Sequence, residues 1–153
     1  SSLPPPPPSL LMSGKRTIVV IGGNGFVGSA ICAALVRRQA PVVSISRSGV
    51  RPAHLRGGDG CWSDAVRWEA GDARDPSTFA GVLAEARAVV LTAGSPPLPF
   101  VDFELQRSLN ATANVATTRA ARDAGVERLV LVNATMPAWL DSVAGGYAQG
   151  KRD

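Results

Sequence analysis

The chain has 153 residues, of which 45% are hydrophobic and 18% charged, and its 16 Lys and Arg against 12 Asp and Glu give a formal net charge of +4. This composition is typical of one globular domain with a sizeable core, and no apolar run approaches the roughly 18 residues of a membrane-spanning helix. The cations are scattered, which disfavours nucleic-acid binding. Two cysteines without a C-x-x-C pair and a single histidine argue against a metal site.

The first fourteen residues differ in composition from the rest. They contain five consecutive prolines, which favour polyproline II and cannot join the interior of a sheet or helix. We therefore expect a Pro-rich arm over residues 1–14 and a nucleotide-binding domain over residues 15–153. The arm is interpreted as a flexible tail, with the end of a processed targeting segment or a partner-binding arm as alternatives.

A glycine-rich turn between a strand and a helix is the strongest functional signal. Thr17–Ile21 is a β-branched, apolar run followed by Gly22, Gly25 and Gly28, the last of which lies in the first turn of a helix predicted from Phe26 to about Arg38. The first glycine permits the turn, the second lets a pyrophosphate approach the backbone, and the third lets the helix pack on the strand. The helix N-terminus offers free N–H groups to the phosphates. The motif predicts dinucleotide binding, with a Rossmann-like turn that has lost its ligand as the alternative.

The end of the second predicted strand, Val42–Ile45, indicates which dinucleotide binds. An acidic residue there would accept from the ribose 2′-hydroxyl of NAD, but the chain has Arg47 between Ser46 and Ser48. An arginine can pair with a 2′-phosphate, so the sequence favours NADP(H) over NAD(H). The alternative is a solvated loop arginine.

Three further segments continue the alternation of strands and helices. A third strand is predicted at Ala65–Ala70, and the following Asp72 either meets the adenine amino group or caps the turn. A helix follows from Asp75-Pro76 to about Ala86, and a fourth strand at Ala88–Thr92 leads into Ala93-Gly94, where a glycine permits close approach of a cofactor.

A long helix and a fifth strand complete the predicted fold. The helix runs from about Val101 to Ala124 and ends at Gly125, and the strand is Arg128–Val132. Small and apolar residues at helical spacing predict the face that packs on the sheet: Leu105, Leu109, Ala113, Ala116 and Ala120. The fold class is α/β, a doubly wound parallel sheet in the order 3-2-1-4-5 with helices on both faces.

Tyr147 and Lys151 lie four residues apart and so share one helical face. The lysine can hold the nicotinamide ribose and lower the pKa of the tyrosine by its charge, and the tyrosine can then exchange a proton with a substrate.

Several motifs resemble those of atypical short-chain dehydrogenase/reductases in the same order: GGNGFVG, SISRSG, WEAGDARD, LTAG, NATANV, AGVERLVLVNA and YAQGK. The likeness is closest to an organellar NAD(P)-binding subgroup with plant and algal members and a fungal mitochondrial reductase-like branch linked to ubiquinone biosynthesis. The nucleotide-binding accessory subunit of respiratory complex I is similar at a greater distance. The resemblance implies a Rossmann domain whose nucleotide is often bound tightly for structure.

Two departures from the family bear on catalysis. Catalytic members place a serine at or just after the end of the fifth strand, where this chain has Asn133-Ala134-Thr135. The sequence also stops shortly after Lys151, where the family continues into a substrate-binding half, so we expect a fragment or a remnant without that half.

The functional prediction combines these observations. We expect an NADP(H)-binding, non-catalytic accessory subunit of a mitochondrial inner-membrane assembly, complex I or a quinone-related complex. It would lie peripherally on the matrix side, with other protein subunits as partners. The alternatives are an NADP-dependent reductase or epimerase that uses Tyr147 and Lys151, and a chloroplast protein of the same subgroup. The predicted nucleotide-binding residues are Gly22, Asn24, Gly25, Phe26, Val27, Gly28, Ser46, Arg47, Ser48, Asp72, Ala73, Ala93, Gly94, Asn110, Tyr147 and Lys151.

Overall fold

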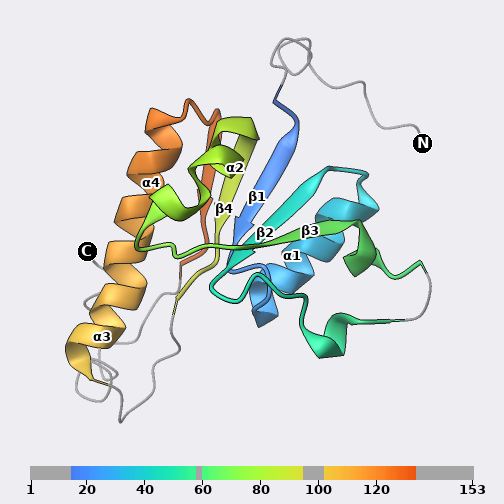
Figure 1. Ribbon diagram of the computed structural model, residues 1–153, viewed down its shortest axis with the longest axis horizontal. Helices are drawn as coiled ribbons and strands as arrows, with labels where there is room; N and C mark the ends of the chain where they lie inside the picture. The colour runs from blue at the N-terminus through green and yellow to red at the C-terminus, as the bar shows by residue number, and fades with distance from the viewer. Residues whose placement is uncertain (1–14, 58–59, 95–101, 134–153) are drawn as a thin grey trace.

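Five parallel strands form one sheet in the order β3-β2-β1-β4-β5 (Figure 1). The computed structural model describes residues 15–57, 60–94 and 102–133. The strands are β1 (Thr17–Ile21), β2 (Val42–Ser46), β3 (Val66–Ala70), β4 (Ala86–Leu91) and β5 (Arg128–Leu131). The α-helices are α1 (Phe26–Arg37), α2 (Ala80–Glu85), α3 (Phe103–Arg107) and α4 (Ala113–Asp123). The predicted fold class and strand order are confirmed.

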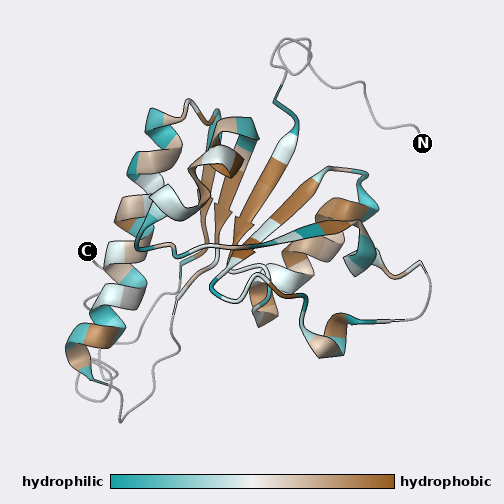
Figure 2. Cartoon of the chain, in the orientation of Figure 1, coloured by the Kyte–Doolittle hydropathy of each residue, from teal (hydrophilic) through white to brown (hydrophobic). Residues whose placement is uncertain are grey.

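The central strand β1 is buried because it has a neighbour on each side and helices on both faces. Val20 pairs with Ser44 of β2 and with Val90 of β4. The apolar colour of β1 after its first residue in Figure 2 matches this position, since a parallel strand covered on both faces has no side that needs polar residues.

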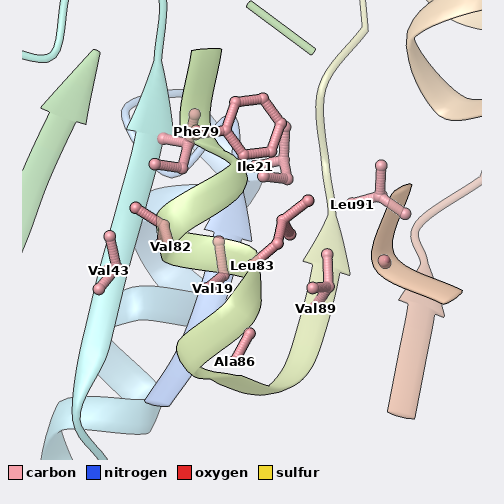
Figure 3. Close-up of a cluster of buried hydrophobic side chains, with 11 residues drawn as sticks. Val19, Ile21, Val43, Phe79, Val82, Leu83, Ala86, Val89 and Leu91 are labelled. Atoms are coloured by element: carbon pink, nitrogen blue, oxygen red, sulfur yellow. The ribbon is translucent and has the colours of Figure 1, made fainter. Parts of the chain in front are cut away.

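The larger core cluster lies on the sheet face covered by α2 and α4, and Figure 3 shows most of it in close-up. Alternate residues of β1, Val19 and Ile21, point to this face, and Phe79, Val82 and Leu83 cover them. All five are less than one-tenth exposed. This packing fixes where the carboxyl end of β1 lies in the domain. The position of the glycine turn that follows β1 is fixed with it.

The opposite face of the sheet is covered by α1. Val20, Cys32, Val42 and Val66 form its buried centre, and Trp62 and Trp68 are among the half-buried side chains that pack against it. Each face of the sheet thus has its own apolar cluster, as a doubly wound fold requires.

The long helix predicted from Val101 is built differently from the prediction. Asp102 caps it by accepting from the N–H of Leu105, and a π-helical turn, Ser108–Thr112, separates α3 from α4. The predicted inner face was wrong at Leu105, whose relative exposure is 46%, and Ala116 and Ala120 are only half-buried. The buried side chains of this region that the predicted inner face did not include are Gln106, Asn110, Ala111, Thr117 and Ala121.

The cause of this error is a combination of chemistry and geometry. Two of the inner positions carry polar amides, Gln106 and Asn110, which a search for apolar spacing passes over. The π-helical turn also adds about one residue to a helical turn, so the inner stripe shifts along the sequence. Ala113 was predicted correctly, and the side chain of Leu109 lies outside the described residues.

Some element ends differ from the prediction by one or two residues. Strand β4 begins at Ala86, two residues early, and the helix before it is a 3₁₀ turn, Pro76–Phe79, followed by α2. Asp75 caps that turn, as its position before a proline predicts, by accepting from the N–H of Ser77 at 3.2 Å. The arm over residues 1–14, Thr135, Tyr147 and Lys151 lie outside the described residues.

Candidate functional site

A cleft of about 700 Å³ opens at the carboxyl ends of the strands. It lies over β1, β2, β3 and β4, the place where open α/β sheets bind their ligands. Nine of the predicted binding residues line it: Gly22, Asn24, Ser46, Arg47, Ser48, Asp72, Ala73, Ala93 and Gly94. The lining residues that the sequence prediction missed are Ile21, Ile45, Gly71, Arg74 and Ala113.

The glycine turn is held between two strands. The N–H of Gly22 donates to the carbonyl oxygen of Ile45 at 2.8 Å, and the N–H of Gly25 donates to that of Gly22 at 3.0 Å. Gly22 has φ +86°, a conformation that side chains with a Cβ rarely adopt. At Gly28, a Cβ would overlap the backbone of Gly22 and Gly23. The first and third glycines therefore have the structural roles that the motif predicts.

Gly25, the second glycine of the motif, has open space beside its Cα atom. Among the described residues, a Cβ at Gly25 would find a single heavy atom within 4 Å outside its chain neighbours, the carbonyl oxygen of Gly22 at 3.3 Å. Gly25 is also the N-cap of α1, and no side chain caps this helix, so its first N–H groups are open to a ligand or water. This arrangement is suited to a phosphate at the positive end of the helix.

The first two residues of α1 expose their side chains to solvent. Phe26 is 94% exposed and Val27 is 47% exposed, and neither lines the cleft. Gly25 and Gly28 are likewise not part of its lining. Any contribution of these residues to a bound phosphate would come from their backbone N–H groups.

The ends of β2 and β3 form one continuous wall of the cleft. Ser46 is paired with Ala70 in the parallel register, and its carbonyl oxygen accepts from Gly71 at 2.9 Å and from Gly49 at 3.2 Å. Arg47 follows directly, is exposed, and has no hydrogen bond or ion pair within the described part of the chain. An unpaired guanidinium on the cleft wall is available to an anionic ligand.

Asp72 and Arg74 form an ion pair on the same wall, which the sequence prediction did not include. Oδ2 of Asp72 accepts from Nη2 of Arg74 at 2.7 Å, and Oδ1 accepts from the Arg74 backbone N–H at 2.9 Å. These bonds to Arg74 and the nearby charge of Arg47 lower the pKa of the Asp72 carboxyl to about 2. The D-x-R spacing in GDARD was the available signal, since an aspartate often bonds to the backbone two residues on.

The end of β4 closes the cleft on the other side of β1. The hydroxyl of Thr92 donates to the carbonyl oxygen of Ile21 at 2.8 Å, and its backbone N–H donates to the same atom at 2.9 Å. A Cβ on Gly22 would lie 3.0 Å from the backbone nitrogen of Ala93. The end of β4 therefore lies directly against the glycine turn.

Asn110 is placed differently from the other predicted residues. It is fully buried in the π-helical turn, where its Nδ2 donates to the carbonyl oxygen of Gln106 at 2.8 Å. Its Oδ1 has no partner within the described residues, and it does not line the cleft, although Ala113 of the next turn does.

The chemistry of the cleft fits a dinucleotide. Its volume is in the range of ordinary cofactor sites. Two arginines and two serines in its lining supply positive charge and donors, and the uncapped N-terminus of α1 follows the glycine turn that borders it. Within the described ranges no three His, Cys, Asp or Glu side chains gather as metal ligands, and no helix there is long and apolar enough to cross a membrane.

Comparison with known proteins gives a family. Residues 18–138 match the NAD dependent epimerase/dehydratase family. An uncharacterized chloroplastic protein of Arabidopsis thaliana is 40% identical over 136 residues, which cover 87% of this chain and 42% of that protein. MIOREX complex component 2 of Saccharomyces cerevisiae is 40% identical over 73 residues, which cover 48% of this chain and 26% of that protein. The chain therefore spans less than half the length of both relatives.

Solved epimerases share the fold. UDP-glucose 4-epimerase of Thermus thermophilus in complex with NAD matches with a TM-score of 0.69 and 21% identity, over 88% of this chain and 47% of that one. The Bifidobacterium longum enzyme in complex with NAD⁺ and UDP matches with a TM-score of 0.64 and 18% identity, over 78% and 37%. The predicted likeness to organellar, atypical short-chain dehydrogenase/reductases is confirmed, and the chain belongs to the NAD dependent epimerase/dehydratase family.

Proposed function

We propose that this chain is the NADP(H)-binding domain of an organellar accessory subunit, and that the nucleotide stabilises the domain and is not turned over. The observation that carries the proposal is the unpaired guanidinium of Arg47 in the cleft where β2 ends. A charge-assisted contact there distinguishes a 2′-phosphate from a ribose hydroxyl. The proposed domain covers residues 15–153, with residues 1–14 as a separate arm.

The proposed nucleotide contacts follow the geometry of the cleft. The pyrophosphate lies at the glycine turn, where the N–H groups from Gly25 to Gly28 are near the start of α1. The adenosine lies toward Arg47 and Asp72, and the nicotinamide end toward Ala93-Gly94. Asn110, Tyr147 and Lys151 complete the proposed set, with the last two supporting the nicotinamide ribose.

The proposed partners are other protein subunits. The yeast relative is by name a component of a complex, which supports membership in an assembly, and the Arabidopsis relative is chloroplastic. We place the protein peripherally on the matrix side of the mitochondrial inner membrane, in complex I or a quinone-related complex, on the strength of the sequence resemblance. A chloroplast location is the alternative. Imaging a fluorescent fusion of the full-length protein distinguishes the two locations.

Nucleotide titration tests the cofactor proposal. Wild-type protein should bind NADPH more tightly than NADH, and Arg47→Asp should reverse this order because it exchanges a phosphate partner for a ribose-hydroxyl acceptor. A charge-assisted contact of about 1.5–3 kcal/mol predicts a change of roughly 10- to 150-fold. Equal affinity of the wild-type protein for both nucleotides would show that Arg47 is not a phosphate ligand. Native mass spectrometry of protein purified from its source reports bound nucleotide and partners together.

The second candidate function is an NADP-dependent reductase or epimerase. It is favoured by the fold shared with UDP-glucose 4-epimerases and by the spacing of Tyr147 and Lys151. Tyr147→Phe removes only the phenolic hydroxyl. On the accessory-subunit proposal this change leaves assembly of the host complex near normal, and on the enzyme proposal it abolishes turnover of a carbonyl or quinone substrate. Tyr147-dependent turnover by the purified protein would overturn the non-catalytic proposal.

A further inference from the structure

Two arginines lie at the same edge of the cleft because the sheet is parallel. Ser46 and Ala70 are paired at the ends of β2 and β3, so the segments that follow, with Arg47 and with Asp72 and Arg74, leave the sheet side by side. Arg47 is near enough to Asp72 for its charge to lower the pKa of that carboxyl. Both guanidinium groups belong to residues that line the cleft.

The ion pair with Asp72 leaves one edge of the Arg74 guanidinium unused. Nε of Arg74 donates to both carboxylate oxygens, at 3.1 and 3.3 Å, and Nη2 donates to Oδ2 at 2.7 Å. Nη1 has no partner within the described residues, and neither does the second N–H of Nη2. These N–H groups form the second donor edge of a planar guanidinium, the edge that suits bidentate contact with a phosphate.

The loop that carries this pair is fixed on both sides. The N–H of Asp75 donates to the carbonyl oxygen of Asp72 at 2.8 Å, and the N–H of Asp72 donates to the hydroxyl of Thr78 at 3.0 Å. From the other side, the hydroxyl of Thr117 on α4 donates to the carbonyl oxygen of Ala73 at 3.0 Å. Arg74 is therefore presented by a braced loop, which lowers the entropy lost when it contacts a ligand.

The charge balance at this edge depends on Arg74. Asp72 is ionised at physiological pH, because its pKa lies far below that pH even before the bonds to Arg74 lower it to about 2. Arg47 and Asp72 alone would sum to zero, and the aspartate would repel a phosphate. With Arg74 the cluster has an excess of one positive charge. The two oxygens of Asp72 are also engaged by Arg74, which favours the turn-forming role for this aspartate over a contact with the adenine amino group.

We propose that Arg74 is a second determinant of NADP(H) specificity, binding the adenosine 2′-phosphate together with Arg47, with Asp72 as the residue that positions its guanidinium. This inference rests on the proposed dinucleotide site. It adds to that site a residue from the loop after β3, which leaves the sheet beside the loop after β2.

Two pairs of ligands that differ only in the 2′-phosphate test the proposal on the full-length chain by calorimetry. The pairs are NADPH with NADH, and adenosine 2′,5′-bisphosphate with adenosine 5′-monophosphate. Arg74→Ala should lower the affinity for both 2′-phosphorylated ligands by at least about tenfold, with the other two unchanged. Arg74→Lys, which keeps the charge but not the fork, should give a smaller loss. Arg67→Ala removes an exposed arginine of β3 that pairs with Glu69, outside the cleft, and should change none of the four affinities.

The outcomes separate this inference from the proposed function. An equal loss for ligands with and without the 2′-phosphate would assign Arg74 to the adenine or ribose and overturn the proposal, as would no loss at all. Wild-type protein that binds NADH as tightly as NADPH would overturn the 2′-phosphate site while leaving a dinucleotide site. Wild-type protein that binds neither would overturn the proposed function together with this inference.

Discussion

The buried hydroxyl of Thr117 donates a hydrogen bond to the carbonyl oxygen of Ala73 at 3.0 Å. This bond joins α4 to the loop that follows β3, although the two segments lie 44 positions apart in the sequence. The loop forms part of the cleft wall, so the position of that wall depends on how the helix is packed.

The hydrogen bond from Thr117 to Ala73 should contribute measurably to the free energy of unfolding. We expect Thr117→Val, which keeps the shape but removes the hydroxyl, to lower the free energy of unfolding by about 1 kcal/mol. Urea unfolding of the nucleotide-free protein measures this. Thr118→Val is the matched control, because Thr118 is the next residue of α4 and is exposed. Equal stability of the two variants would show that the hydrogen bond does not stabilise the loop.

Three Gly→Ala variants should separate binding from folding. Gly25→Ala should keep the fold but lose nucleotide affinity, because the added Cβ meets only the Gly22 carbonyl oxygen within the protein yet occupies the space of the phosphate. Gly28→Ala should destabilise the fold by about 1–3 kcal/mol, because its Cβ overlaps the backbone of the turn. In α2, Gly81→Ala meets nothing within 4 Å and should stabilise by about 0.5–1 kcal/mol. Thermal unfolding and NADPH titration check all three, and a Gly25→Ala variant with wild-type affinity would rule out the turn as the phosphate site.

The ion pair between Asp72 and Arg74 should make the free energy of unfolding depend on pH. Its pKa is lowered from 3.8 to about 2 in the folded chain, first by the side-chain hydrogen bond to Arg74. A lowered carboxyl pKa stabilises the fold fully above pH 3.8, and this contribution is lost as pH falls through about 2. Asp72→Asn should therefore be less stable than wild type at pH 6, by about 0.2–1 kcal/mol for a partly exposed pair, and this difference should shrink as pH falls through about 2. Urea unfolding midpoints of both proteins, measured from pH 6 down to about pH 2, test this prediction. A stability difference that grew toward low pH would contradict it.

The two cysteines should differ in reactivity. Burial raises the pKa of the Cys32 thiol to about 12, whereas hydrogen bonds from Ser63 lower the pKa of the half-buried Cys61 thiol. The thiolate is the reactive form, so iodoacetamide at pH 7.5 should label Cys61 first and Cys32 only after unfolding. Ser63→Ala should slow the labelling of Cys61. Peptide mass spectrometry follows both sites, and equal rates in the native protein would contradict the assignment.

The sequence was sufficient to predict the features that depend on local chemistry. The β-branched run before Gly22 and the spacing of the three glycines predicted β1, the turn and α1, because Gly22 and Gly28 answer constraints of backbone geometry. The cap at Asp75 and the end of α4 at Gly125, with φ 69°, were predicted for the same reason.

Features that depend on tertiary contacts were predicted less well. The residues from Leu83 to Arg87 favour a helix, yet Ala86 already pairs with Thr17 of β1, so sheet pairing overrides helix propensity at the start of β4. The inner face of α3 and α4 was wrong because its buried positions include the polar Gln106 and Asn110. Arg74 was missed because its position depends on a side-chain bond to Asp72 that no periodicity reveals.

The hydrogen bonds that hold the glycine turn in place affect the order in which the chain folds. Its first residue is bonded to Ile45 of β2, and the residue before it accepts from Thr92 after β4. The turn is therefore completed only when strands from distant parts of the chain have docked on β1, and such non-local pairing is slow. A dinucleotide that bound the finished turn and not the unfolded chain would therefore stabilise the folded state increasingly as its concentration rises.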